Sequence, residues 1–153
     1  MAPLERGREL SALSSNFQMV PRSSRIHSGR QTAMKRPYRG INPAAKPSGS
    51  ECKECLAAGG WWLHLRRCAE CGHIGCCDTS PGQHAAKHAA ESGHPVVASF
   101  EPLQSWFYDY EKKKVFRGFR LAPPRFHPEN QPVPGPKGSV PENWESLLHE
   151  VAW

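Results

Sequence analysis

The sequence predicts a small α+β module with a short antiparallel sheet and one main helix, stabilised by bound metal. All six cysteines fall between residues 52 and 94, together with several histidines. The chain has 153 residues, of which 38% are hydrophobic, so it can bury only a modest core. A core of that size usually needs a metal or disulfides. Short aromatic and β-branched segments flank one alanine-rich segment, which indicates strands around a helix.

The spacing of the cysteines is typical of zinc sites. Cys52 and Cys55 form one Cys-x2-Cys pair, and Cys68 and Cys71 form another. Each pair supplies half of the four ligands of a structural zinc. The other candidate ligands are Cys76, Cys77, His84, His88 and His94. Disulfides would leave the interleaved histidines unexplained, and the polar, basic start of the chain does not resemble a secretion signal. We therefore expect zinc and a cytoplasmic location.

Local signals place the elements of this module in order. Gly59-Gly60 predicts a turn, and Gly72 predicts a positive φ after the second cysteine pair. Ser80-Pro81 predicts the cap and first residue of a helix that continues over residues 83–92 and ends at Gly93. Strands are expected over residues 61–65, 96–100, 106–110 and 115–121, with the three lysines 112–114 in a turn.

The flanking segments differ from the module in composition. Residues 1–50 contain nine Lys or Arg against two acids and lack hydrophobic periodicity, which predicts a disordered basic tail. The module itself is expected over residues 51–121. Residues 122–153 are rich in proline and are expected to end in a short amphipathic helix that folds back onto the module. Its apolar face would contain Trp144, Leu147, Leu148 and Val151.

These motifs resemble the UBP-type zinc finger, the ubiquitin-binding module of ubiquitin-specific proteases and of one histone deacetylase. The resemblance extends over about residues 51–120 and is strongest to small stand-alone bacterial members. The residues that carry it are the two cysteine pairs, Gly60-Trp61-Trp62, Cys76, His84-x3-His88 and Ser92-Gly93-His94-Pro95.

The resemblance implies two interleaved zinc sites. Cys52, Cys55, Cys76 and His84 would hold the first ion, and Cys68, Cys71, His88 and His94 the second. Some members hold a third zinc, but Phe107 and Tyr110 stand at those positions, so we expect two ions. Cys77 is left as a spare thiol, which we expect to be a packed small residue.

The resemblance also implies a pocket for the C-terminal carboxylate of ubiquitin. Trp62, Trp106 and Tyr108 correspond to its aromatic residues, which core packing would equally explain. Asp78 and Thr79 stand where ubiquitin-binding members have arginine and tyrosine, and an aspartate repels a carboxylate. We therefore expect weak ubiquitin binding, unless another cation such as Arg66, Arg67 or Arg117 compensates.

The function expected is a non-catalytic zinc module that binds a protein or peptide tail. Eight ligands fill two sites and leave no open position for catalysis, and no G-x-S-x-G motif is present. Nucleic-acid binding through the basic tails is the alternative, but residues 51–110 contain seven acids against four Lys or Arg. A zinc–thiol redox sensor based on Cys77 is a further alternative. No run of about 20 apolar residues predicts a membrane span.

Overall fold

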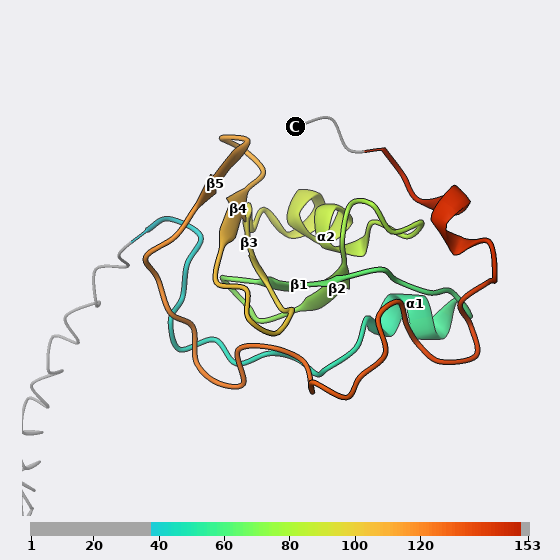
Figure 1. Ribbon diagram of the computed structural model, residues 1–153. Coiled ribbons are helices and arrows are strands. Elements are labelled where there is room, and N and C mark those ends of the chain that lie inside the picture. The colour runs from blue at the N-terminus through green and yellow to red at the C-terminus, as the bar shows by residue number, and fades with distance from the viewer. Residues whose placement is uncertain (1–37, 151–153) are drawn as a thin grey trace, which may run out of the picture. The chain divides into compact units, whose positions relative to one another are not determined.

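A computed structural model of the chain describes residues 38–150 (Figure 1). Its centre is an antiparallel sheet of five strands in the order β2-β1-β3-β4-β5, and α2 contacts β1 and β2. The strands are β1 (Leu65–Cys68), β2 (Ile74–Cys76), β3 (Val96–Ser99), β4 (Phe107–Asp109) and β5 (Lys114–Phe116). The helices are α1 (Lys53–Ala57), α2 (His84–Ser92) and the 3-10 turn η1 (Trp144–Leu147). The expected α+β class is confirmed.

Two apolar clusters stabilise this sheet. The first contains Cys52, Cys55, Trp62, Leu65, Ile74, Cys76 and Phe100, so it surrounds candidate metal ligands. The second contains Ile41, Ala69, Val96, Ala98, Phe107 and Leu121, with the rings of Tyr38, Phe116 and Phe119 packed against it. Because neighbouring residues of a strand face opposite sides, Arg66 and Arg67 of β1 point to different faces of the sheet. Arg67 is 1% exposed and pairs in register with Ala98 of the second cluster.

The first strand lies further along the chain than residues 61–65. Trp62 instead forms a two-residue bridge with Gly135, with hydrogen bonds of 2.7 and 2.9 Å in the two directions. The last strand is also shorter than expected and ends at Phe116, just before Gly118 adopts a φ of +107°. The first difference arises from a contact with a distant segment, and the second follows the local backbone conformation at Gly118.

The main helix begins at His84, three residues after the expected start. Ser80 does not cap it, because its hydroxyl oxygen accepts a hydrogen bond from the backbone N–H of Leu63 at 2.9 Å. The residue before the helix is Gln83, in the left-handed conformation with a φ of 49°. Gly93 ends the helix with a φ of 72°, as expected. Gly75 is also required, because a Cβ there would lie 2.7 Å from the backbone nitrogen of Ala85.

Residues 38–50 do not behave as a tail, and the expected boundary at residue 50 needs correction. Ile41 is fully buried, and the backbone N–H of Asn42 donates to the carbonyl of Ala69 at 2.8 Å. The segment passes so close to the second cysteine pair that a Cβ on Gly72 would lie 1.8 Å from the carbonyl oxygen of Lys46. The rest of the expected tail, residues 1–37, lies outside the described residues.

The segment after β5 runs beside residues 38–50 along one edge of the view in Figure 1. The backbone N–H of Ala122 donates to the carbonyl of Pro43 at 2.8 Å, which joins the two segments. The buried guanidinium of Arg67 also joins them. It donates to Ala122 at 2.8 Å, to Pro124 at 3.1 Å and to the carbonyl of Ala45.

The helix expected over residues 141–153 is reduced to the single turn η1. Leu148 is extended rather than helical, and the next N–H, that of His149, donates to the carbonyl of Thr79 at 2.9 Å. This contact takes the chain out of the helix. Leu147 is 46% exposed, and Val151 lies outside the described residues. Within residues 38–150, no helix has the length and apolar character needed to cross a membrane.

Candidate metal centre and ligand surface

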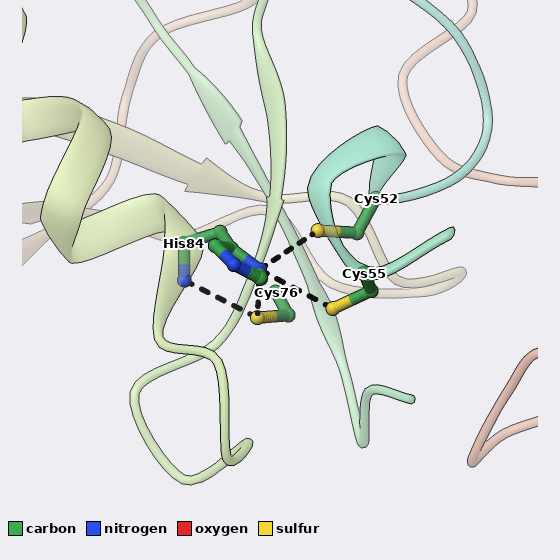
Figure 2. A group of neighbouring side chains, drawn as sticks. All are labelled: Cys52, Cys55, Cys76 and His84. Atoms are coloured by element: carbon green, nitrogen blue, oxygen red, sulfur yellow. Dashed lines mark hydrogen bonds between the residues drawn. The ribbon is translucent and has the colours of Figure 1, made fainter. Parts of the chain in front are cut away.

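One group of candidate ligands gathers where α1, β2 and the start of α2 meet (Figure 2). The sulfur atoms of Cys52, Cys55 and Cys76 lie 3.3, 3.2 and 3.3 Å from the Nδ1 atom of His84. All three cysteines are buried, and none forms a disulfide. The backbone N–H of His84 also donates to the sulfur of Cys76 at 3.2 Å, a contact that suits a thiolate.

A second group lies at the other end of the helix. Cys68 and Cys71 approach His88 and His94, and the four ligand atoms lie within 4.8 Å of one another. The sulfur of Cys71 is 3.3 Å from Nε2 of His88, and that of Cys68 is 3.6 Å from Nδ1 of His94. The structure thus brings together the two sets of four that the family resemblance implied.

The donor sets fit zinc in chemistry and in spacing. With Zn–S near 2.3 Å and Zn–N near 2.0–2.1 Å, tetrahedral geometry places a sulfur and a nitrogen about 3.5 Å apart. The observed separations of 3.2 to 3.6 Å agree. Burial raises the pKa of the Cys68 thiol to about 12, so its thiolate needs a nearby cation at neutral pH. Three thiolates and one imidazole, or two of each, would supply that chemistry.

Residues outside the two groups orient the ligands. The ring of His73 stacks on that of His88, with centroids 4.1 Å apart and planes 9° from parallel, and its Nε2 contacts the carboxylate of Glu54. Such outer contacts hold a ligand ring in place. No sequence pattern distinguishes His73 from an ordinary surface histidine, because its partners Glu54 and His88 come from α1 and α2.

Residues 52–117 match the family model described as "Zn-finger in ubiquitin-hydrolases and other protein". This segment is a zinc finger of that type. It contains both ligand groups, and zinc binding follows from the match and the geometry together. A protein from Rhodopseudomonas palustris, with a structure solved by solution NMR, is similar to this zinc finger at 41% identity. The alignment covers 60% of this chain and 85% of that one, with a TM-score of 0.48. No match was found among curated proteins.

The three aromatic residues considered for peptide binding do not share one surface of this zinc finger. Trp62 is 1% exposed. Its backbone pairs with Gly135, and its side chain belongs to the apolar cluster that contains the cysteines of the first group. Trp106 and Tyr108 are only half-buried, and Tyr108 lies on β4. A ligand could therefore reach Trp106 and Tyr108, whereas Trp62 packs in the core.

A cation lies beside these two accessible aromatic residues. The guanidinium carbon of Arg66 is 4.6 Å from the ring centroid of Trp106, and its Nη1 donates to the carbonyl of Leu65 at 3.0 Å. Burial lowers the pKa of Arg66, and this effect exceeds the opposing influence of nearby acidic groups. Within residues 38–150, no carboxylate forms an ion pair with it. Arg66 is therefore a cation on this surface. The sequence identifies it as a candidate, but its position over Trp106 follows only from the structure.

Asp78 and Thr79 lie at the edge of the same surface. The hydroxyl of Tyr110 donates to a carboxylate oxygen of Asp78 at 2.8 Å, and burial raises the pKa of that phenol. The backbone carbonyl of Thr79 accepts the hydrogen bond from the N–H of His149 that was described above. The segment that follows η1 therefore lies close to the place where the family resemblance puts a ligand.

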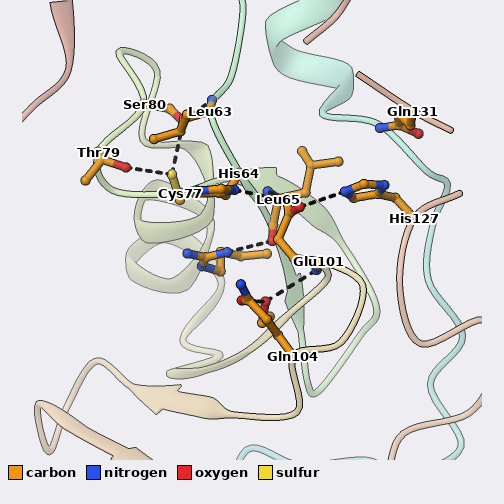
Figure 3. A network of polar contacts seen from close by, with 12 residues as sticks. Leu63, His64, Leu65, Cys77, Thr79, Ser80, Glu101, Gln104, His127 and Gln131 are labelled. Atoms are coloured by element: carbon orange, nitrogen blue, oxygen red, sulfur yellow. Dashed lines mark hydrogen bonds and ion pairs between the residues drawn. The ribbon is translucent and has the colours of Figure 1, made fainter. Parts of the chain in front are cut away.

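Cys77 is buried and belongs to neither ligand group. Its sulfur lies 2.9 Å from the hydroxyl of Thr79 and 3.2 Å from that of Ser80, contacts that Figure 3 shows. Two hydroxyl partners and 3% exposure fit the packed small residue expected from the sequence.

A buried carboxylate between β3 and β4 fixes the loops around this surface (Figure 3). Glu101 accepts from the backbone N–H of Leu65 at 2.8 Å, and its other oxygen lies 2.8 Å from Nε2 of His127. Burial would raise the pKa of Glu101, but contacts with His64, Leu65 and His127 outweigh it and lower the pKa to about 2. The carboxylate thus stabilises the fold above pH 4.5, and this contribution disappears as the pH falls toward 2.

Proposed function

We propose that the chain is a non-catalytic module, held by two zinc ions, that binds the tail of a protein or peptide. The observation that carries the binding role is Arg66, a cation without an ion-pair partner in the described part of the chain, set over the ring of Trp106. An aromatic wall next to a guanidinium suits an extended peptide that ends in or carries a carboxylate. We place the module in a reducing compartment such as the cytoplasm, where zinc thiolates persist.

The module is proposed to be non-catalytic because of the composition of its two ligand groups. Each contains four protein donors, which completes a tetrahedral zinc site. A catalytic zinc needs a position for water or substrate. The proposal assigns the ions the structural role of positioning α1, α2 and the loop between Cys76 and His84.

Purified protein is expected to contain two zinc ions per chain, measured by mass spectrometry under non-denaturing conditions. The Cys77→Ala variant should retain both, because Cys77 lies outside the two ligand groups. One ion, or three, would contradict the proposed assignment. Zinc loss in the Cys77 variant would show that Cys77 rather than Cys76 serves as a ligand.

The proposal includes weak or undetectable binding to the C-terminus of ubiquitin. Asp78 repels a carboxylate at the position where ubiquitin-binding members have a cation, and the loss of one partner from such a pair costs about 2–5 kcal/mol. That loss weakens a micromolar interaction roughly thirtyfold or more. A calorimetric titration with a peptide ending in a free Gly-Gly carboxylate tests this. Low-micromolar binding by the natural chain would contradict it.

Two variants separate the contributions to this surface. Asp78→Arg combined with Thr79→Tyr should strengthen binding of the Gly-Gly peptide roughly thirtyfold or more. Arg66→Gln should weaken whatever carboxylate binding the natural chain has, whereas Arg39→Gln, which removes the same charge at a site 81% exposed, should not. An amidated peptide is the matched control ligand. If the double change brings no gain, the pocket differs by more than these two residues.

A further inference from the structure

A cavity of about 580 Å³ lies beside Arg67, whose side chain points to the face of the sheet opposite that of Arg66. Arg67, Phe107 and the loop before β4 form one side, and the segment after β5 forms the other. Its arginines are Arg67, Arg117, Arg120 and Arg125, and no aspartate or glutamate lines it. Most of these arginines follow or end the segment that matches the zinc-finger family, so the family's ligand site does not account for the cavity.

The deepest arginine has unmet hydrogen-bonding capacity. Arg67 is 1% exposed, and its Nε atom has no hydrogen-bond partner among residues 38–150. Burial, together with the nearby charge of Arg125, lowers the pKa of Arg67 to about 10. A buried cation beside a second cation, without a carboxylate, is costly. An anion in the cavity would offset that cost.

The outer arginines are also unpaired within the described chain. Arg117, Arg120 and Arg125 are exposed, and no carboxylate of residues 38–150 forms an ion pair with them. Elsewhere in the described chain, Arg39 lies 3.6 Å from Glu111, and the Nζ atom of Lys112 lies 3.6 Å from the carboxylate of Asp109. Three arginines without such a partner therefore gather around one cavity.

Aromatic rings supply the second feature of the cavity. Trp106 and Phe126 stand at its wall, and Phe126 is 44% exposed. Exposed aromatic side chains beside arginines are the groups on which nucleobases stack, while planar guanidinium groups bind phosphate with two parallel hydrogen bonds. The volume lies within the range of small-molecule sites, about 300–1,000 Å³. An acidic peptide would use the arginines but would leave the rings uncovered.

We propose that this cavity binds a nucleotide, with its phosphate against Arg117, Arg120 and Arg125 and its base against Trp106 and Phe126. A free mononucleotide and the phosphorylated end of a single strand offer the same chemistry. The two proposed surfaces share the ring of Trp106 but use different cations, Arg66 for the peptide and Arg117, Arg120 and Arg125 for the phosphate. Substitutions of these arginines therefore test the two proposals separately.

The test is a titration of the full zinc-loaded chain with adenosine 5′-monophosphate, followed by calorimetry and by NMR of the indole and arginine Nε–H signals. We expect saturable binding at one site, with shifts at Trp106 and Arg67. Adenosine and ribose 5-phosphate should each bind more weakly, because each lacks one half of the recognised chemistry. A 5′-phosphorylated oligonucleotide that binds more tightly than the mononucleotide would identify a strand end as the source.

The matched variants change charge by the same amount at two places. Arg117→Gln with Arg120→Gln should weaken binding about tenfold or more, since two charge-assisted contacts are lost. Lys113→Gln with Lys114→Gln, at the exposed last residue of the turn and the exposed first residue of β5, should leave the affinity within about twofold, because these lysines lie outside the cavity. Zinc content verifies that each variant folds. The comparison of the mononucleotide with adenosine and ribose 5-phosphate uses the natural chain, so it does not depend on the folding of any variant.

Three results would overturn the proposal. One is the absence of saturable binding of the mononucleotide. Another is equal affinity for ribose 5-phosphate, which would reduce the cavity to an unselective anion site. The third is displacement of the nucleotide by a glutamate-rich peptide that binds more tightly, which would make an acidic protein segment the ligand.

Discussion

Replacement of Cys55 with alanine is expected to unfold most of the module. Cys55 is 2% exposed and approaches His84 in the first ligand group, which also contributes to an apolar cluster. Structural zinc contributes on the order of 10 kcal/mol to the folding of small zinc domains, comparable with the whole stability of a domain. Circular dichroism and zinc content of the purified variant would show the loss of structure and of metal together.

The Cys77→Ala variant is the control for this experiment. It removes a sulfur atom that is equally buried and adjacent to the ligand Cys76, but lies outside both ligand groups. The control should melt cooperatively with its metal in place. A Cys55 variant that melted as the control does would show that the first ligand group is not needed for the fold.

Replacement of Arg67 with methionine is expected to lower the free energy of unfolding by about 3 kcal/mol or more. The change removes hydrogen bonds from a guanidinium to the carbonyls of Ala45, Ala122 and Pro124, and a hydrogen bond that involves a charged group contributes about 1.5–3 kcal/mol. Relief of the desolvated charge offsets part of this cost. Urea unfolding of the zinc-loaded protein measures the difference.

Arg117→Met provides the comparison for that measurement. It removes the same type of side chain from an exposed position of the cavity wall, so the change in unfolding free energy should stay within about 0.5 kcal/mol. If Arg67→Met costs as little as Arg117→Met, the flanking segments are held by other contacts.

The sequence was sufficient where the determining chemistry is local. The pairs Cys52/Cys55 and Cys68/Cys71 gather because two intervening residues allow both sulfurs to reach one metal. Gly93 ends α2 because its positive φ suits glycine. The strands β3 and β4 formed within the ranges that their apolar and aromatic residues predicted.

The sequence was insufficient where contacts join distant residues. Residues 38–50 lack hydrophobic periodicity and are therefore predicted to be part of the disordered tail, but they join the module through the buried side chain of Ile41 and through backbone hydrogen bonds that no residue pattern reveals. Ser80 has the pattern of a helix cap but bonds to Leu63, seventeen residues earlier. The environment of Arg66 likewise depends on which strands are neighbours, so its place over Trp106 required the structure.

The helix α2 carries ligands of both groups, His84 in its first turn and His88 one turn later. Ions held at those two positions would therefore share one rigid support. Loss of either ion would leave one end of α2 unanchored and would weaken the binding of the other ion. Occupancy of the two sites would therefore be cooperative. Fully loaded and empty chains would then dominate over half-loaded ones, and the abundance of the folded protein would respond steeply to the free zinc concentration.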